Sequence, residues 1–147
     1  MKFNYAFQKV VDLKTNEKRQ AEWMLSAAVG ILQNEMSSLE QLLEDKRRLA
    51  ASMQEEAQKT ASCLSLQAMQ QYAEHLERCI ASKSKDVDHA EQNVEQNKAH
   101  LSSRMLDEKV WLKARDKSLQ AFRQQMLLRE QSELDEMATV RFAMKAR

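Results

Sequence analysis

The absence of proline constrains this chain more than any other feature. No proline occurs among the 147 residues, and Gly30 is the only glycine. These two residue types normally supply about a tenth of a chain and punctuate its sheets and tight turns. Charged residues make up 31% of the sequence, and their signs are interspersed. The composition therefore predicts an all-α protein made of long helices with solvated outer faces.

The stretch Lys59–Ser65 is where the helical pattern stops and must restart. Its hydroxyl and thiol residues are Thr60, Ser62, Cys63 and Ser65. Ser65 is placed to cap the backbone N–H groups of a new helix that opens at Leu66. We therefore expect a single antiparallel coiled-coil hairpin over residues 1–147. Its parts are a helix over about 4–58, a bend over about 59–65 and a helix over about 66–144.

A seven-residue repeat of apolar side chains runs through the first predicted helix. Most of its positions are apolar, which is a strong indication of a coiled coil. The four exceptions are Lys14, Lys18, Glu35 and Lys46, which weaken the pairing without preventing it, because long side chains keep their charges in water. The positions are Phe7, Val11, Lys14, Lys18, Ala21, Leu25, Ala28, Leu32, Glu35, Leu39, Leu42, Lys46, Leu49 and Met53.

The second predicted helix carries two apolar series in succession. The first is Leu66, Ala73, Ile80, Val87, Val94 and Leu101, with Met69, Leu76 and Ala90 in the partner register. The second is Met105, Leu112, Leu119 and Met126, with Phe122 between its last members. A fold-back centred near residue 62 brings Phe7 to the region of Lys117 and Leu25 to Leu101.

The first helix then offers nothing to cover a C-terminal overhang of residues 123–147. This overhang stays amphipathic through Leu134, Met137 and Val140. Because an isolated helix of this kind is marginal in water, the segment must find a partner or fray. We expect the chain alone to be a monomer, and self-association through the stripe from Met126 to Val140 stays open.

Few residues offer chemistry. His75 and Cys79 lie one helical turn apart, but a tetrahedral zinc site needs four ligands, and His89 and His100 are too far along the helix. A single glycine leaves no phosphate-binding loop, and the acidic pairs have no enclosed pocket that would raise a pKa. We predict a protein that is not an enzyme and that has no cofactor or metal.

The balance of charge argues against two classes of partner. The 23 basic and 22 acidic residues give a net charge of +1, which creates no broad field for nucleic acid or an anionic membrane. The uncharged runs, including residues 23–34 and the longer run 60–73, are all shorter than the roughly 18 residues that a membrane-spanning helix needs. Two cysteines and the lack of a secretory signal pattern indicate the cytosol.

Three segments stand out in order along the chain, namely residues 3–14, 69–76 and 130–141. Together they resemble the FliJ family of flagellar export proteins. The run EQSELDEMATVR is similar to the closing signature of that family, and the aromatic-flanked opening is similar to its start. A Gln-Gln-aromatic stretch after the bend is also similar. The residues that carry the resemblance are Phe3, Phe7, Gln8, Lys9, Val10, Leu13, Lys14, Met69, Gln70, Gln71, Tyr72, Leu76, Glu130, Glu133, Leu134, Asp135, Glu136, Met137, Ala138 and Arg141.

The resemblance implies a component of the bacterial flagellar type III export apparatus, which serves motility and chemotaxis. FliJ-like proteins are antiparallel coiled coils similar in shape to the central stalk of rotary ATPases. They bind the hexameric export ATPase, promote its assembly and activity, link it to the cytoplasmic region of the large export-gate membrane subunit, and handle export chaperones. The implied location is the cytoplasmic side of the membrane at the flagellar base. Two alternatives stay open: a generic coiled-coil tether, and the equivalent stalk of a virulence-type type III secretion system.

The resemblance also implies an export-gate contact on one face of the second helix, formed by Tyr72, Leu76, Cys79 and Lys83. Cys79 stands where a small residue suffices in the family, and Lys83 stands where an imidazole is usual. Without the family, Leu76 is a seam residue and its neighbours are the flank. For the ATPase ring we infer contact through the end that holds both termini. Those residues are Phe3, Phe7, Phe122, Glu130, Leu134, Asp135, Met137 and Arg141.

A patch on the outer face of the first helix combines Trp23 with the small residues Ala27 and Gly30. Glycine costs a helix about 1 kcal/mol relative to alanine, so close approach of another chain at Gly30 is a reasonable hypothesis. A solitary exposed tryptophan needs no such explanation, however.

Overall fold

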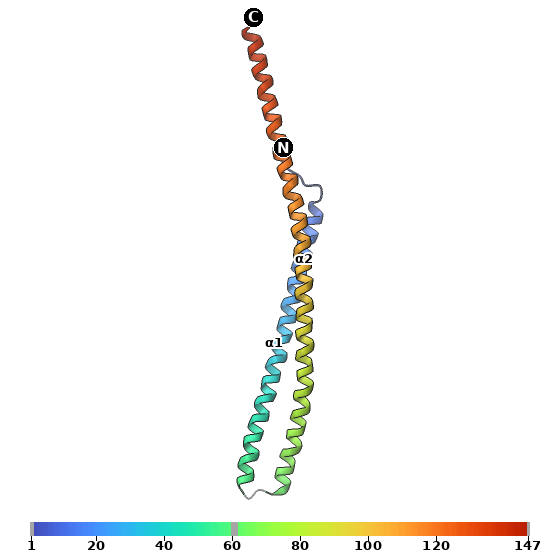
Figure 1. Ribbon diagram of the computed structural model, residues 1–147, viewed down its shortest axis with the longest axis vertical. Helices are drawn as coiled ribbons and strands as arrows, with labels where there is room; N and C mark the ends of the chain where they lie inside the picture. The colour runs from blue at the N-terminus through green and yellow to red at the C-terminus, as the bar shows by residue number, and fades with distance from the viewer. Residues whose placement is uncertain (1, 60–61, 147) are drawn as a thin grey trace. The chain divides into compact units, whose positions relative to one another are not determined.

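The computed structural model describes residues 2–59 and 62–146, which form two long helices (Figure 1). Helix α1 spans Gln8–Gln58 and helix α2 spans Cys63–Lys145. The prediction of an all-α chain with two long helices packed against each other is confirmed. The chain divides into two compact units. We call residues 20–102 the hairpin unit and residues 1–19 with 103–147 the terminal unit.

The helix ends differ from the predicted ones. Helix α1 begins at Gln8 rather than near residue 4, and α2 begins at Cys63 rather than at Leu66. The Ser62 hydroxyl accepts a hydrogen bond from the backbone N–H of Ser65 at 3.3 Å. This is the geometry of an N-cap, so the prediction that Ser65 caps α2 is wrong and Ser62 takes that place. Thr60 lies outside the described residues.

The core of the hairpin unit is built from small and medium apolar residues. Within this unit α1 and α2 run side by side in opposite directions (Figure 1). Because alanines occupy several of the buried positions, the two helix backbones can approach closely there. The buried side chains are Ala21, Ala28, Leu76, Val87, Ala90 and Val94. The leucines of the predicted α1 seam, at positions 25, 32, 39, 42 and 49, are half-buried beside them.

Two charged seam positions of the hairpin unit face opposite charges on α2. The Lys83 ammonium lies 3.0 Å from the Glu35 carboxylate and 3.8 Å from Asp86. Lys46 lies 3.8 Å from Glu77. The hydrogen bond to Glu35 raises the pKa of Lys83 above its ordinary value. The charged residues that interrupt the apolar seam are therefore matched across it.

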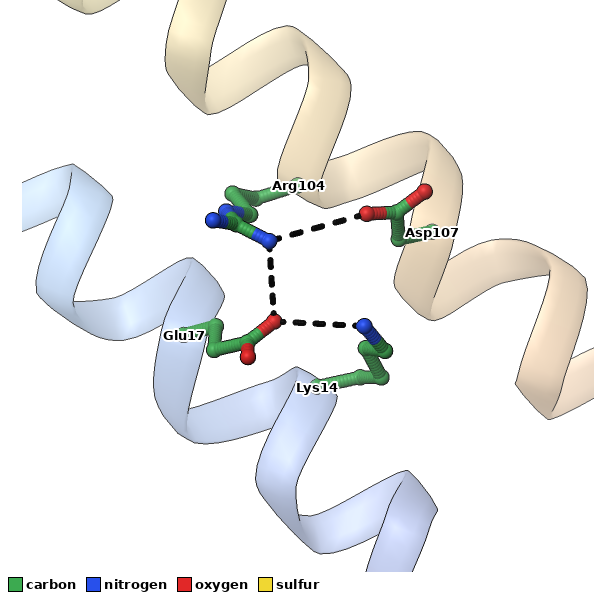
Figure 2. A network of polar contacts seen from close by, with 4 residues as sticks. All are labelled: Lys14, Glu17, Arg104 and Asp107. Atoms are coloured by element: carbon green, nitrogen blue, oxygen red, sulfur yellow. Dashed lines mark hydrogen bonds and ion pairs between the residues drawn. The ribbon is translucent and has the colours of Figure 1, made fainter.

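The terminal unit contains a denser network of ion pairs, shown in Figure 2. One carboxylate oxygen of Glu17 accepts from the Arg104 guanidinium at 3.1 Å and lies 3.4 Å from the Lys14 ammonium. Arg104 also reaches Asp107 at 3.8 Å. The network therefore joins α1 to α2 through Glu17 and Arg104, with one further charged residue on each helix.

A second ion pair lies in the same unit. The Lys18 ammonium donates to the Glu108 carboxylate at 3.1 Å. This hydrogen bond holds the pKa of Glu108 below its ordinary value, against the opposing effect of its partial burial. Here too a lysine that interrupts the predicted seam finds a partner on α2.

The predicted second apolar series of α2 is wrong at its first member. Met105 is 52% exposed, whereas Arg104 and Glu108 on either side of it are half-buried against α1. Farther along, Trp111, Leu112 and Leu119 are half-buried. The positions of α2 that face α1 here are held by Arg104 and Glu108, which form ion pairs with α1. The apolar Met105 lies one position beyond Arg104, outside this face.

Candidate functional site: an aromatic cluster and an exposed helix end

Five aromatic rings form a cluster in the terminal unit. The Phe3 and Phe122 ring centroids are 5.4 Å apart, and Phe7 and Trp111 are 6.0 Å apart. Tyr5 bridges the two pairs, at 6.4 Å from Phe3 and 5.8 Å from Phe7. These separations are those of attractive aromatic pairs. The cluster fixes the segment before α1 against α2.

The sequence-based prediction placed one of these aromatic residues elsewhere and missed two others. Phe7 was expected in the core opposite Lys117, but it packs on Trp111 and remains 54% exposed. Trp111 and Tyr5 were missed as members of the site. Counting in steps of seven from Ala90 through Asn97 and Arg104 leads to Trp111, so accepting polar and charged residues in the seam would have found it.

The C-terminal segment of α2, residues 127–145, is exposed throughout. Leu134 and Met137 are 65% and 64% exposed, and together with Val140 they form a contiguous exposed apolar patch. They line a shallow groove whose rim is charged. The groove residues are Glu130, Glu133, Leu134, Glu136, Met137, Val140 and Arg141. The segment therefore presents an apolar strip, formed by Leu134, Met137 and Val140, with a border of charged residues.

The residues inferred to contact an ATPase ring fall into two groups within the terminal unit. Phe3, Phe7 and Phe122 belong to the aromatic cluster. Glu130, Leu134, Met137 and Arg141 line the groove of the C-terminal segment. Asp135 lies on the same segment, where its backbone carbonyl accepts from the Thr139 hydroxyl at 2.8 Å. Asp135 does not line the groove.

The four residues implied for an export-gate contact differ in accessibility. Tyr72 is 51% exposed and Leu76 is 3% exposed. Cys79 is half-buried, and Lys83 is engaged with Glu35. Leu76 is thus a seam residue, and the surface that a partner could touch consists of Tyr72, Cys79 and the outer part of Lys83.

The histidine and cysteine of this region contact each other. The Cys79 sulfur lies 3.6 Å from His75 Nε2, and the His75 ring is 6.3 Å from the ring of Tyr72. In the part of the chain that the structure describes, no group of three or more potential ligands is arranged to hold a metal ion. The pair therefore belongs to the same exposed flank as Tyr72.

The patch around Gly30 has an open outer face. Trp23 is 80% exposed, and a methyl group added at Gly30 would meet nothing within 4 Å. Ala27 lines a shallow groove of the hairpin unit together with residues of α2. That groove is formed by Met24, Ala27, Ala28, Ile31, Asn93, Gln96, Asn97 and His100. No packing within the described chain requires a glycine at position 30.

Comparison with known proteins places these features in a family. The sequence model of the family described as Flagellar FliJ protein matches residues 2–147. Among solved structures, one described as a YscO homologue from Chlamydia trachomatis is similar, with a TM-score of 0.57 and 15% sequence identity. The similarity covers 95% of this chain and 94% of that one, and at this identity it shows the fold alone. A comparison with curated protein sequences found no significant match.

Neither helix contains, within the residues described, a stretch long and apolar enough to cross a membrane. The family match extends over both helices, the aromatic cluster and the C-terminal segment. The chain therefore belongs to the FliJ family, a family of non-enzymatic components of the flagellar export apparatus.

Proposed function

We propose that this chain is the stalk protein that binds the hexameric export ATPase and promotes its assembly and activity. In the same proposal it contacts the cytoplasmic region of the large export-gate subunit and handles export chaperones. It acts in the cytoplasm, peripherally at the membrane of the flagellar base. Membership in the family argues against an unrelated structural tether.

The observation that carries this proposal is the exposed C-terminal segment. Leu134, Met137 and Val140 share one groove and remain more than half exposed. Burying a side chain of this size contributes about 1.5–3 kcal/mol, so a protein that covers the groove gains substantial binding energy. The interior of a ring is one surface that can surround a single helix. The aromatic cluster supports the same contact, because it fixes α2 at the start of this segment.

The proposed gate contact rests on the flank of α2 near Tyr72. Since Leu76 is buried in the seam, it supports this contact only by holding α2 in place. Tyr72 offers an exposed ring and a hydroxyl, a combination common at protein interfaces. The Tyr72→Ala variant should lose binding to the cytoplasmic region of the gate subunit, while Gln71→Ala, at an exposed position on another face, should retain it. Equal binding by both variants would remove Tyr72 from the contact.

The ATPase contact is tested with the cognate export ATPase and three variants of this chain. ATP hydrolysis and ring assembly are measured with the full chain, with a chain ending at Arg129, with Leu134→Glu and with Leu128→Glu. Leu128 is 70% exposed on the opposite side of the helix from Met137 and serves as the matched control. We expect truncation and Leu134→Glu to abolish stimulation and Leu128→Glu to preserve it. Full stimulation by the truncated chain would mean that another part of the protein binds the ring.

A second candidate is the equivalent stalk of a virulence-type secretion system. We retain this candidate because the chain is similar in fold to a protein described as a YscO homologue. Deletion of the gene separates the two candidates, because loss of swimming with intact effector secretion indicates the flagellar role. Loss of effector secretion with normal swimming indicates the other.

A further inference from the structure

Apolar and charged residues follow a definite order along one face of the C-terminal segment. Leu127, Leu134 and Met144 are 65%, 65% and 74% exposed. At the helical spacing of three and four they share one face with Glu130, Met137 and Arg141. Leu128 and Phe142, also exposed, fall on the other side of the helix. The face therefore reads apolar, acidic, apolar, apolar, basic, apolar along the chain.

This order is complementary to its own reverse. When two such helices lie antiparallel, Leu127 meets Met144, Leu134 meets Met137, and Glu130 meets Arg141. The residue numbers of each pair add to the same total, as antiparallel pairing in a single register requires. Each apolar residue then meets an apolar one and each charge meets its opposite. Ala138, next to the centre of the pairing, is small enough to allow close approach.

A parallel arrangement does not have this property. It would place Glu130 against Glu130 of the other copy and Arg141 against Arg141. Like charges in such positions oppose association. Within one copy the two residues cannot pair with each other either, because about 16 Å of helix separates them. The charge pattern thus selects one orientation and one register.

We propose that the C-terminal segments of two copies of this chain pair as an antiparallel two-helix coiled coil. The interface is isologous, as is usual for dimers with two-fold symmetry. It is short, so the dimer is weak, with a dissociation constant on the order of 100 µM. The dilute chain is then a monomer, and the concentrated chain covers its own apolar strip.

The dimer uses the same strip as the proposed ATPase contact, so the two states exclude each other. Self-pairing keeps the strip covered where the chain is locally abundant and no ATPase is bound. The inference itself does not rest on the proposed ATPase function, because it follows from the sequence order and exposure of one helix face. Its test contains no ATPase, so its failure and the failure of the proposed function are distinguishable.

Sedimentation equilibrium over a range of concentrations tests the pairing. The weight-average mass of the wild-type chain should rise with concentration from 17.1 kDa toward twice that value. Glu130→Arg and Arg141→Glu should each raise the dissociation constant about tenfold, because each reversal spoils two symmetry-related pairs. Asp135→Arg, the same change of charge away from the strip, should leave the dissociation constant unchanged. Circular dichroism confirms that each variant remains helical.

The double variant decides the orientation. A chain carrying both Glu130→Arg and Arg141→Glu restores both ion pairs in the antiparallel dimer and should associate as well as the wild-type chain. In a parallel dimer it would still bring like charges together. A wild-type chain that stays monomeric up to about 1 mM would overturn the proposal, since a dimer of the proposed strength would be largely formed there. Failure of the double variant to recover association would also overturn it.

Discussion

The hairpin unit and the terminal unit hold their helices together with different residues. In the hairpin unit α1 and α2 meet through alanine, valine and leucine, and the few charged seam residues are isolated ion pairs. In the terminal unit they meet through the Glu17 and Arg104 network, the Lys18 and Glu108 pair and the aromatic cluster. Farther along the terminal unit α2 is exposed on all sides. Helix α2 is therefore supported by packing in the hairpin unit and as far as the aromatic cluster in the terminal unit, and only its C-terminal segment is available for binding.

The largest expected effect comes from exchanging one leucine in each unit for alanine. Leu76→Ala removes a side chain that is 3% exposed in the hairpin seam and should destabilise folding by about 2–3 kcal/mol. Leu134→Ala removes an exposed side chain of the same type and should change stability by less than about 0.5 kcal/mol. Urea unfolding of the dilute chain measures both. Equal losses at the two positions would show that the C-terminal segment is packed in the monomer.

The next largest effect is expected from removing an ion-pairing side chain of the terminal unit. Arg104→Ala removes the contacts of this guanidinium with Glu17 and Asp107, and we expect a loss of about 1 kcal/mol in the free energy of unfolding. Arg123→Ala, at an exposed position on the same helix, is the control and should change stability little. High salt should narrow the difference between the two variants, because it screens partly exposed charges. A loss that is unaffected by salt would mean that Arg104 acts by packing its alkyl chain instead.

These ion pairs also mark the limit of what the sequence could predict. The heptad of α1 located Ala21 and Ala28 in the core correctly because apolar periodicity follows from helix geometry alone. It treated Lys14 and Lys18 as weak points in the seam. The partners that Glu17 and Lys18 find on α2, Arg104 and Glu108, are identified only once the two helices are aligned. Following apolar residues alone placed Met105 in the core, where the structure has it exposed.

The candidate functional residues were also predictable only where helix length and periodicity determine their exposure. Exposure of Leu134 and Met137 follows from counting how much of α2 the shorter α1 can cover. The aromatic cluster was only partly anticipated, since contacts among Tyr5, Phe7 and Trp111 depend on the path of the segment before α1. Ser62 was overlooked as the cap because capping is decided by which residue keeps a non-helical backbone.

A smaller effect of opposite sign is expected at Gly30 in the hairpin unit. Gly30→Ala should stabilise the chain by about 0.5–1 kcal/mol, because alanine has the higher helix propensity and its methyl group meets nothing within 4 Å. Thermal unfolding measures the change. Binding assays with the gate subunit and with chaperones then show whether the bare backbone at this position serves a partner. Destabilisation by alanine would contradict the open surroundings of Gly30.

The smallest effect is the response of the Lys18 and Glu108 pair to acid. Because the pKa of Glu108 is lowered in the folded chain, its stabilisation is complete above the ordinary value of 4.5 and is lost as the pH falls through the lowered value. Glu108→Gln should therefore unfold at a lower temperature than the wild-type chain at neutral pH. At about pH 3 the two melting temperatures should lie closer together. Glu133→Gln, on the exposed C-terminal segment, should match the wild-type chain at both pH values.

The contrast between the two units is tested most directly by amide hydrogen exchange along α2 in the dilute chain. Exchange should be slow in the hairpin unit around Val87 to Val94, intermediate near Trp111 and Phe122, and fast over residues 130–145, because only packed parts of a helix resist opening. Adding the export ATPase should slow exchange in residues 130–145 and leave the hairpin unit unchanged. Protection as strong at residues 130–145 as at Val94 in the dilute free chain would contradict the account, because that segment would then already have a partner.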